Sequence, residues 1–226
     1  MQTEQEIQDA AKAIISFADT YTQNKLGKQN DQSEQESIQS LIDIISSLEC
    51  LKDQMRMNKS YKSVIRIPKL YQSLSALAIF KIGVILTDEI NEQRFMVRHL
   101  SGNCLWHTQI CGDEQDQTEL VRQGYGRMMS ITFCTAGGKG EEYDQEIFNV
   151  LRCIYGFLHA LHYGRNDYGQ PSQQPLPLLY PVSLEQIEEE GAIEEIEAQM
   201  KTKGNQWSIE HQANLAKSPI LNHFIN

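Results

Sequence analysis

Apolar residues recur every three to four positions along most of this 226-residue chain, which is the spacing that gathers them on one face of an α-helix. Strand signals are scarce, because no hairpin dipeptide joins two alternating runs. We therefore predict an all-α fold. The pattern places helices at residues 2–21, 38–57, 69–86, 91–110, 118–122, 143–163, 183–190 and 192–200, in a stretch that ends at Phe133, and from Gln206 onward with a break near Pro219.

Polar and proline-rich stretches interrupt these helices. Residues 24–37 are mostly Gln, Asn, Ser, Lys and acidic residues with almost nothing to bury, so they predict a linker. Residues 164–181 hold four of the six prolines, so we expect an extended loop outside the helical stack. The expected division is therefore N-terminal helices and linker in residues 1–60, followed by helical repeats with one proline-rich insertion in residues 61–226.

A partial internal repeat supports a repeat architecture. Gly124 and Gly191 each follow a short helix and precede a second helix, a loop and a long third helix. The two glycines are 67 residues apart, or 47 once the 20 residues of 165–184 are set aside. That period is at the upper edge of the range of armadillo and HEAT repeats, so we predict an armadillo/HEAT-like right-handed helical solenoid.

Charge and cysteine usage narrow the class of partner. The chain carries 30 acidic and 20 basic residues, a net charge of −10, which makes nucleic acid a poor partner and a basic peptide or protein a favourable one. The five cysteines include no Cys-x-x-Cys pair, so they predict reduced thiols and no zinc site. No apolar run is long enough for a membrane span, and the polar, acidic start lacks the features of a secretory signal. We expect a soluble intracellular protein.

Catalytic signatures are missing from the sequence. His159 and His162 lie near Cys153 on one predicted helix, but no third and fourth donor stands at a workable spacing for a metal. The run Gly137-Gly138-Lys139-Gly140 lacks the spacing of a phosphate-binding loop. We therefore expect no enzyme activity, no cofactor and no metal.

Two groups of residues are candidates for partner binding. Trp106 is either a core residue or a groove residue. In a groove, its ring would stack on the stem of a peptide Lys or Arg while Gln109 hydrogen-bonds the peptide backbone. Asn103 is the third candidate of this peptide-binding set. The second group lies in residues 184–200, which contain no Lys or Arg, and it favours either a solvated helix face or an acidic rim for a basic partner. Its members are Glu188, Glu189, Glu190, Glu194, Glu195 and Glu197.

The C-terminal residues resemble a known family. Residues 186–199, with Asn205, Ala213 and residues 220–224, are similar to the last armadillo repeat of importin alpha, and residues 116–124 and 147–161 are similar to the repeats that precede it. The resemblance covers roughly residues 91–226. It implies an adaptor of nucleocytoplasmic protein import, present in cytoplasm and nucleus, that binds basic localisation peptides or a karyopherin-type transport receptor.

The chain also departs from that family. Importin alpha binds its peptides through repeated Trp-x-x-x-Asn pairs, whereas Ile110 stands at the fourth position after Trp106, and Gln109 matches the asparagine only if one residue is deleted. The Arg-rich segment that recruits importin beta has no counterpart in residues 1–60, which are acidic and Gln-rich. The chain thus resembles a shortened, divergent relative. The alternative is an armadillo-type scaffold of a larger assembly that does not recognise localisation signals.

Overall fold

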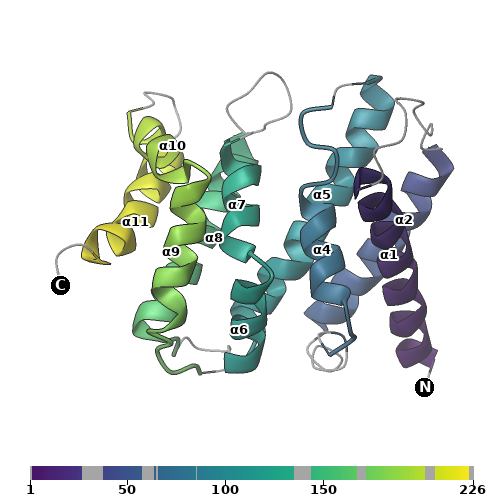
Figure 1. The fold of residues 1–226 in the computed structure, drawn as a ribbon, viewed down its shortest axis with the longest axis horizontal. Helices are drawn as coiled ribbons and strands as arrows, with labels where there is room; N and C mark the ends of the chain where they lie inside the picture. The colour runs from purple at the N-terminus through teal and green to yellow at the C-terminus, as the bar shows by residue number, and fades with distance from the viewer. Residues whose placement is uncertain are drawn as a thin grey trace. The chain divides into compact units, whose positions relative to one another are not determined.

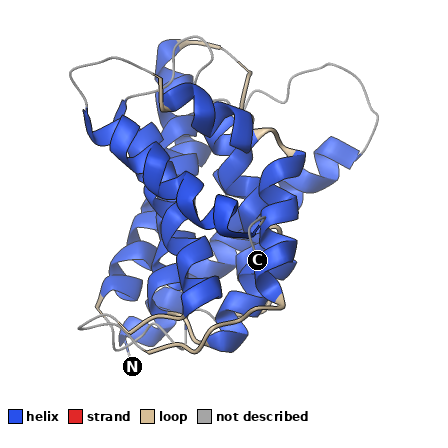
Figure 2. Ribbon diagram, turned by 90° about the vertical axis from the view of Figure 1, so that its left-hand side faces the viewer, coloured by secondary structure: helices blue, strands red, loops and turns tan. Residues whose placement is uncertain are grey.

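The computed structural model describes residues 2–26, 38–57, 64, 66–84, 86–134, 144–166, 172–201 and 207–223. Over these residues the regular structure is helical, and the only β feature is an isolated antiparallel bridge between Arg165 and Gln173 (Figure 2). The predicted all-α class is confirmed. The chain forms two compact units, Met1–Thr108 and Gln109–Asn226.

The first unit consists of α1 (Gln2–Leu26), α2 (Ile38–Arg56), α4 (Leu70–Ala78) and most of α5 (Asp88–Cys111). Helix α1 packs against both α2 and α4 (Figure 1), because its apolar residues recur at helical spacing and share one face. The buried residues that form this part of the core are Ile7, Ala11, Ile14, Leu41, Ile44, Leu48, Leu51, Leu74 and Leu77.

The helix predicted over residues 69–86 is shorter in the structure. It begins at Leu70, after Lys69 with a φ of 67°, and ends at Ala78. The chain then turns, with Lys81 at a φ of 44°, and this turn directs the buried Phe80 ring against Phe17 and Tyr21 of α1 at centroid distances of 5.6 and 4.8 Å. Apolar content alone therefore overestimated the length of this helix.

The division between units differs from the one expected at residue 60. Helix α4 packs on α1, and Lys69 Nζ lies 3.5 Å from Asp19 Oδ2, so residues on both sides of position 60 belong to the first unit. Helix α1 extends through Leu26 into the predicted linker. The rest of that linker, residues 27–37, lies outside the described residues.

The second unit contains two groups of three helices. The first group is α6 (Glu114–Arg122), α7 (Tyr125–Cys134) and α8 (Asp144–Tyr163), and the second is α9 (Leu179–Glu189), α10 (Ala192–Gln199) and α11 (Trp207–His223). Gly124 and Gly191 join the first two helices of each group, and both have a φ of 74°, which an L side chain rarely adopts. Helix α7 packs on α9 and α8 on α11 (Figure 1), so the second group stacks on the first.

The segment predicted as a loop outside the stack packs against the second unit at three positions before α9, namely Arg165, Gln173 and Leu176. Arg165 and Gln173 exchange two backbone hydrogen bonds of 2.8 Å and are both buried. The buried Leu176 donates its backbone N–H to Leu161 of α8 at 2.7 Å. Helix α9 already begins at Leu179 and includes Pro181, because a first-turn proline lacks only an N–H that would have no intrahelical partner. The prediction of an external loop is therefore wrong at Arg165, Gln173 and Leu176 and at residues 179–181, whereas the other described residues of 164–178 are non-helical, and all of them except Gly164 are exposed.

Candidate functional site

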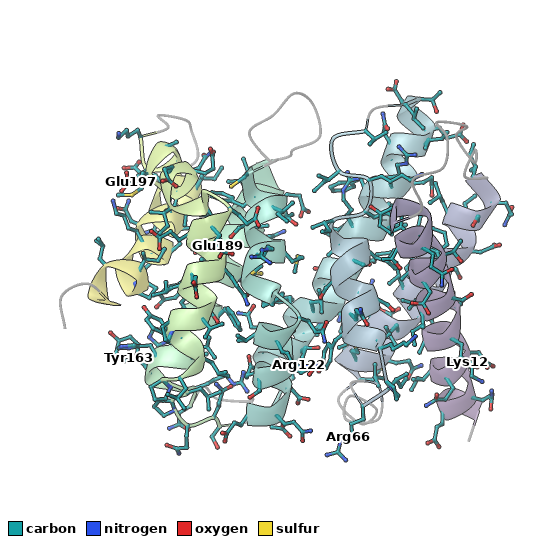
Figure 3. All side chains as sticks on the ribbon, viewed as in Figure 1. Lys12, Arg66, Arg122, Tyr163, Glu189 and Glu197 are labelled. Carbon is teal, nitrogen blue, oxygen red and sulfur yellow. The ribbon has the colours of Figure 1, made fainter. Side chains whose placement is uncertain are left out.

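The six predicted glutamates flank the turn between α9 and α10. Gly191 lies between the two helices with a φ of 74°, so three glutamates precede the turn and three follow it. Two of them, Glu189 and Glu197, are labelled in Figure 3. Glu190 and Glu195 are half-buried and the other four are exposed. We call this set the acidic edge, and its members are Glu188, Glu189, Glu190, Glu194, Glu195 and Glu197.

The helix dipole accounts for only two of the six members of the acidic edge. Glu194 and Glu195 lie in the first turn of α10, where negative charge is favourable. Glu188, Glu189 and Glu190 lie at the C-terminal end of α9, where the dipole disfavours negative charge. Their gathering at this end therefore calls for another source of positive charge.

Arg127 and Lys217 of the second unit supply part of this positive charge. Arg127 of α7 forms an ion pair with Glu189 and places its Nε 3.0 Å from Glu190 Oε1. Lys217 of α11 donates to Glu197 Oε1 at 2.6 Å, and this hydrogen bond lowers the pKa of Glu197. Arg127 and Lys217 thus pair with three of the six carboxylates, and the charge of Lys201 also lowers the pKa of Glu197. Within the described residues Glu188 and Glu194 have no ion pair.

The thiol of Cys134 lies close to three of these carboxylates. It lies at the end of α7 and donates to the backbone carbonyl of Glu190 at 3.3 Å. Burial, together with the carboxylates of Glu195, Glu190 and Glu194, raises the pKa of this thiol to about 11. A site with this negative field favours a cationic partner.

Gln109, predicted to bind a peptide backbone, is instead a structural residue of the second unit. It is 4 % exposed, its Nε2 donates to the carbonyl of Cys153 at 3.1 Å, and its Oε1 accepts from the Tyr125 hydroxyl at 2.9 Å. Both side-chain amide atoms are therefore occupied inside the protein. This corrects the expectation for Gln109, whose amide joins α5 to α7 and α8.

Trp106 and Asn103, the other two predicted peptide-binding residues, are half-buried on α5. Asn103 Nδ2 lies 2.9 Å from His99 Nε2, and the Trp106 ring centroid is 5.4 Å from that of His107. Burial and the charges of Arg56 and Lys52 on α2 lower the pKa of His107. Lys52 also forms an ion pair with Asp53 at 3.6 Å, so a carboxylate accompanies these cations on α2.

Metal ligands, reactive thiols and membrane-spanning helices are the other candidate features for the described residues. His159 lies between the rings of Tyr155 and Tyr163, at 5.4 and 4.9 Å, and the described residues contain no group of three or more His, Cys, Asp and Glu that could hold a metal ion. Burial raises the pKa of the Cys104 and Cys153 thiols to about 12, so they are poor nucleophiles. No described helix is both long and apolar enough to cross a membrane.

Arg127, the cation that connects α7 to the acidic edge, is not among the residues predicted from the sequence. The repeat contained a signal for it, because Arg127 lies three residues after Gly124 and Glu194 lies three residues after Gly191. Aligning the two groups on their glycines would have placed a cation in one group at the position of an acid in the other.

Comparison with known proteins gives no relative: no protein-family model matches the chain, and no curated protein or solved structure matches it either. The resemblance to importin alpha stays a prediction from the residues.

Proposed function

We propose that this chain is a non-enzymatic protein-binding adaptor whose acidic edge binds a basic segment of a partner protein. The observation that carries the proposal is the excess of carboxylates at the α9–α10 turn, where Arg127 and Lys217 pair with three of the six glutamates. Lys or Arg side chains of a partner would offset the repulsion between these glutamates, and steering by the exposed charges would speed association.

The finer proposal is an armadillo-like, right-handed helical solenoid resembling importin alpha. Its support is the pair of three-helix groups with a left-handed glycine at the same place in each. In this proposal the protein acts in nucleocytoplasmic import, in cytoplasm and nucleus, and binds a localisation-type peptide or a transport receptor.

A scaffold of a larger assembly, without recognition of localisation signals, is the second candidate. The burial of Gln109 favours it, because Trp106 then lacks an amide on the next turn that could hold a peptide backbone. In both candidates the acidic edge is the contact surface, and they differ in the role of Trp106.

Titration of a fluorescent Lys/Arg-rich peptide tests the proposal. The variant Glu188→Gln/Glu194→Gln should weaken binding several-fold, since one exposed carboxylate contributes ~1 kcal/mol or less. Arg127→Gln should strengthen binding, because it releases Glu189 and Glu190. Affinity should fall steeply with salt, as the Debye length is about 8–10 Å at physiological ionic strength.

The matched control is Glu89→Gln/Glu92→Gln, which removes the same charge from exposed positions of α5. An equal loss in this control, or no binding at tens of micromolar in low salt, contradicts the proposal. Trp106→Ala separates the two candidates, because a stacking role predicts a loss of ~1–2 kcal/mol and the scaffold predicts none.

A further inference from the structure

Helix α9 exposes apolar side chains at its first turn. Leu178, the residue before the helix, is 85 % exposed and has a helical backbone with φ −77° and ψ −25°. Val182, one turn later, is 43 % exposed. The opposite face carries Tyr180, Leu184 and Ile187, which are buried, so the core of the second unit is already filled without Leu178 and Val182.

The exposed apolar residues continue into acidic ones along the same line of the helix. Positions 178, 182, 185 and 189 are separated by four, three and four residues, so their side chains lie in one stripe along the outer side of α9. We call Leu178, Val182, Glu185 and Glu189 the α9 stripe. At 1.5 Å per residue it is roughly 16 Å long, apolar at its first end and acidic at its second.

Glu185 and Glu189, the acidic half of the stripe, can pair with a cation of a partner. Glu185 is exposed and takes part in no ion pair within the described residues. Glu189 shares Arg127 with Glu190, so the single guanidinium leaves negative charge uncompensated there. A partner that covers Leu178 and Val182 therefore gains most if it carries positive charge one to two turns further along.

We propose that the α9 stripe docks an amphipathic helix of a partner protein, whose apolar side chains cover Leu178 and Val182 and whose Lys or Arg side chains pair with Glu185 and Glu189. A helix is the matching shape, because it presents side chains at the same three- and four-residue spacing along one face. The inference rests on the proposed function and specifies the conformation and apolar content of the basic partner.

A second copy of the chain is a poor occupant of the stripe. Parallel pairing of two α9 helices would oppose carboxylate to carboxylate. Antiparallel pairing would press Glu185 and Glu189 against Leu178 and Val182 of the other copy, which removes water from a charge without giving it a partner. Charge complementarity thus selects a basic partner.

The test compares two fluorescent peptides of about 18 residues and identical composition. One places Leu and Lys on a single helical stripe, with the Leu residues at one end, and the other has the same residues in scrambled order. Leu178→Ser/Val182→Ser should weaken binding of the first peptide about tenfold or more and leave the weaker binding of the scrambled peptide unchanged. The first peptide should also gain helical circular dichroism on binding.

Leu221→Ser is the matched control, because Leu221 of α11 is 47 % exposed and lies outside the stripe. It should leave both affinities unchanged. Equal binding of the two peptides, with no effect of the Leu178 and Val182 substitutions, overturns the amphipathic helix while binding at the acidic edge survives. Failure of both peptides to bind in low salt contradicts the proposed function as well. If the protein forms a dimer that Leu178→Ser dissociates, the stripe binds a second copy of the chain and not a basic helix.

Discussion

Two hydrogen bonds hold the side-chain amide of Gln109 inside the second unit. Its Nε2 donates to the carbonyl of Cys153, and its Oε1 accepts from the hydroxyl of Tyr125. The residue is 4 % exposed, so water cannot replace a partner that is removed. Loss of either hydrogen bond therefore leaves a buried polar atom unpaired, which costs stability.

Tyr125→Phe should destabilise the protein by ~1–3 kcal/mol, because it leaves the buried Oε1 of Gln109 without a hydrogen-bond donor. Urea unfolding measures this change. Tyr155→Phe is the control, since Tyr155 contacts His159 through its ring, and this substitution should change stability by less than about 0.5 kcal/mol. Equal effects of the two substitutions would show that the Tyr125 hydroxyl contributes nothing specific.

Gly191→Ala should cost ~1–2 kcal/mol, because an L residue at a φ of 74° is strained. The nearest atom to an added Cβ is Glu194 Oε2 at 3.9 Å, so the cost comes from the backbone and not from a clash. Gly191→Asn should cost less, since asparagine tolerates this region best after glycine. Thermal unfolding of both variants measures this difference in stability. An Ala variant as stable as the Asn variant would contradict the explanation.

At the level of elements, the sequence predicted the existence of most helices and missed several of their ends. Periodicity reports which side chains are apolar and does not report where the backbone turns. The helix predicted over residues 69–86 therefore lost its second half to a turn at Lys81, a residue type not expected at a positive φ. In 164–181 the prolines predict a loop outside the helical stack. Arg165 and Leu176 are nevertheless buried in the second unit, and Pro181 lies in the first turn of α9.

The crossing of α7 and α9 depends on Gly126. A Cβ at this position would lie 3.0 Å from the carbonyl oxygen of Ser183 and 3.1 Å from Gln186 Cβ, so Gly126→Ala should destabilise by ~1–3 kcal/mol. Gly102→Ala provides the control, because no atom lies within 4 Å of its added Cβ, and alanine in a helix interior should stabilise by roughly 0.5–1 kcal/mol. Opposite signs in urea unfolding are expected, and a stabilising Gly126→Ala would contradict the close crossing.

On the scale of the whole molecule, the sequence predicted the all-α class, and the compact units divide after Thr108 and not near the expected residue 60. Contacts of Phe17 and Tyr21 with Phe80 join helices on both sides of residue 60 within the first unit. The acidic edge was visible in the composition of residues 184–200, since seven glutamates stand there without a cation. Arg127 was not, because it reaches the edge from 62 residues away.

Buried thiols should make stability fall in alkali. Burial raises the pKa of Cys104 and Cys153 from 9.0 to about 12, so above pH 9.0 the unfolded chain loses these protons while the folded chain retains them. The folded state then binds more protons, and the free energy of unfolding decreases as pH rises through this range. Urea unfolding between about pH 7 and pH 10.5 measures the slope. Cys153→Ala should reduce it, and a flat profile above pH 9.0 would contradict the burial of these thiols.

A basic partner should bind at the acidic edge and not around Trp106. Amide chemical-shift mapping during titration with a Lys/Arg-rich peptide in low salt locates the binding site. We expect the perturbed amides to cluster in residues 185–197, on both sides of Gly191. Perturbations confined to α5 around Trp106, or spread evenly over the exposed acids of both units, would contradict the claim.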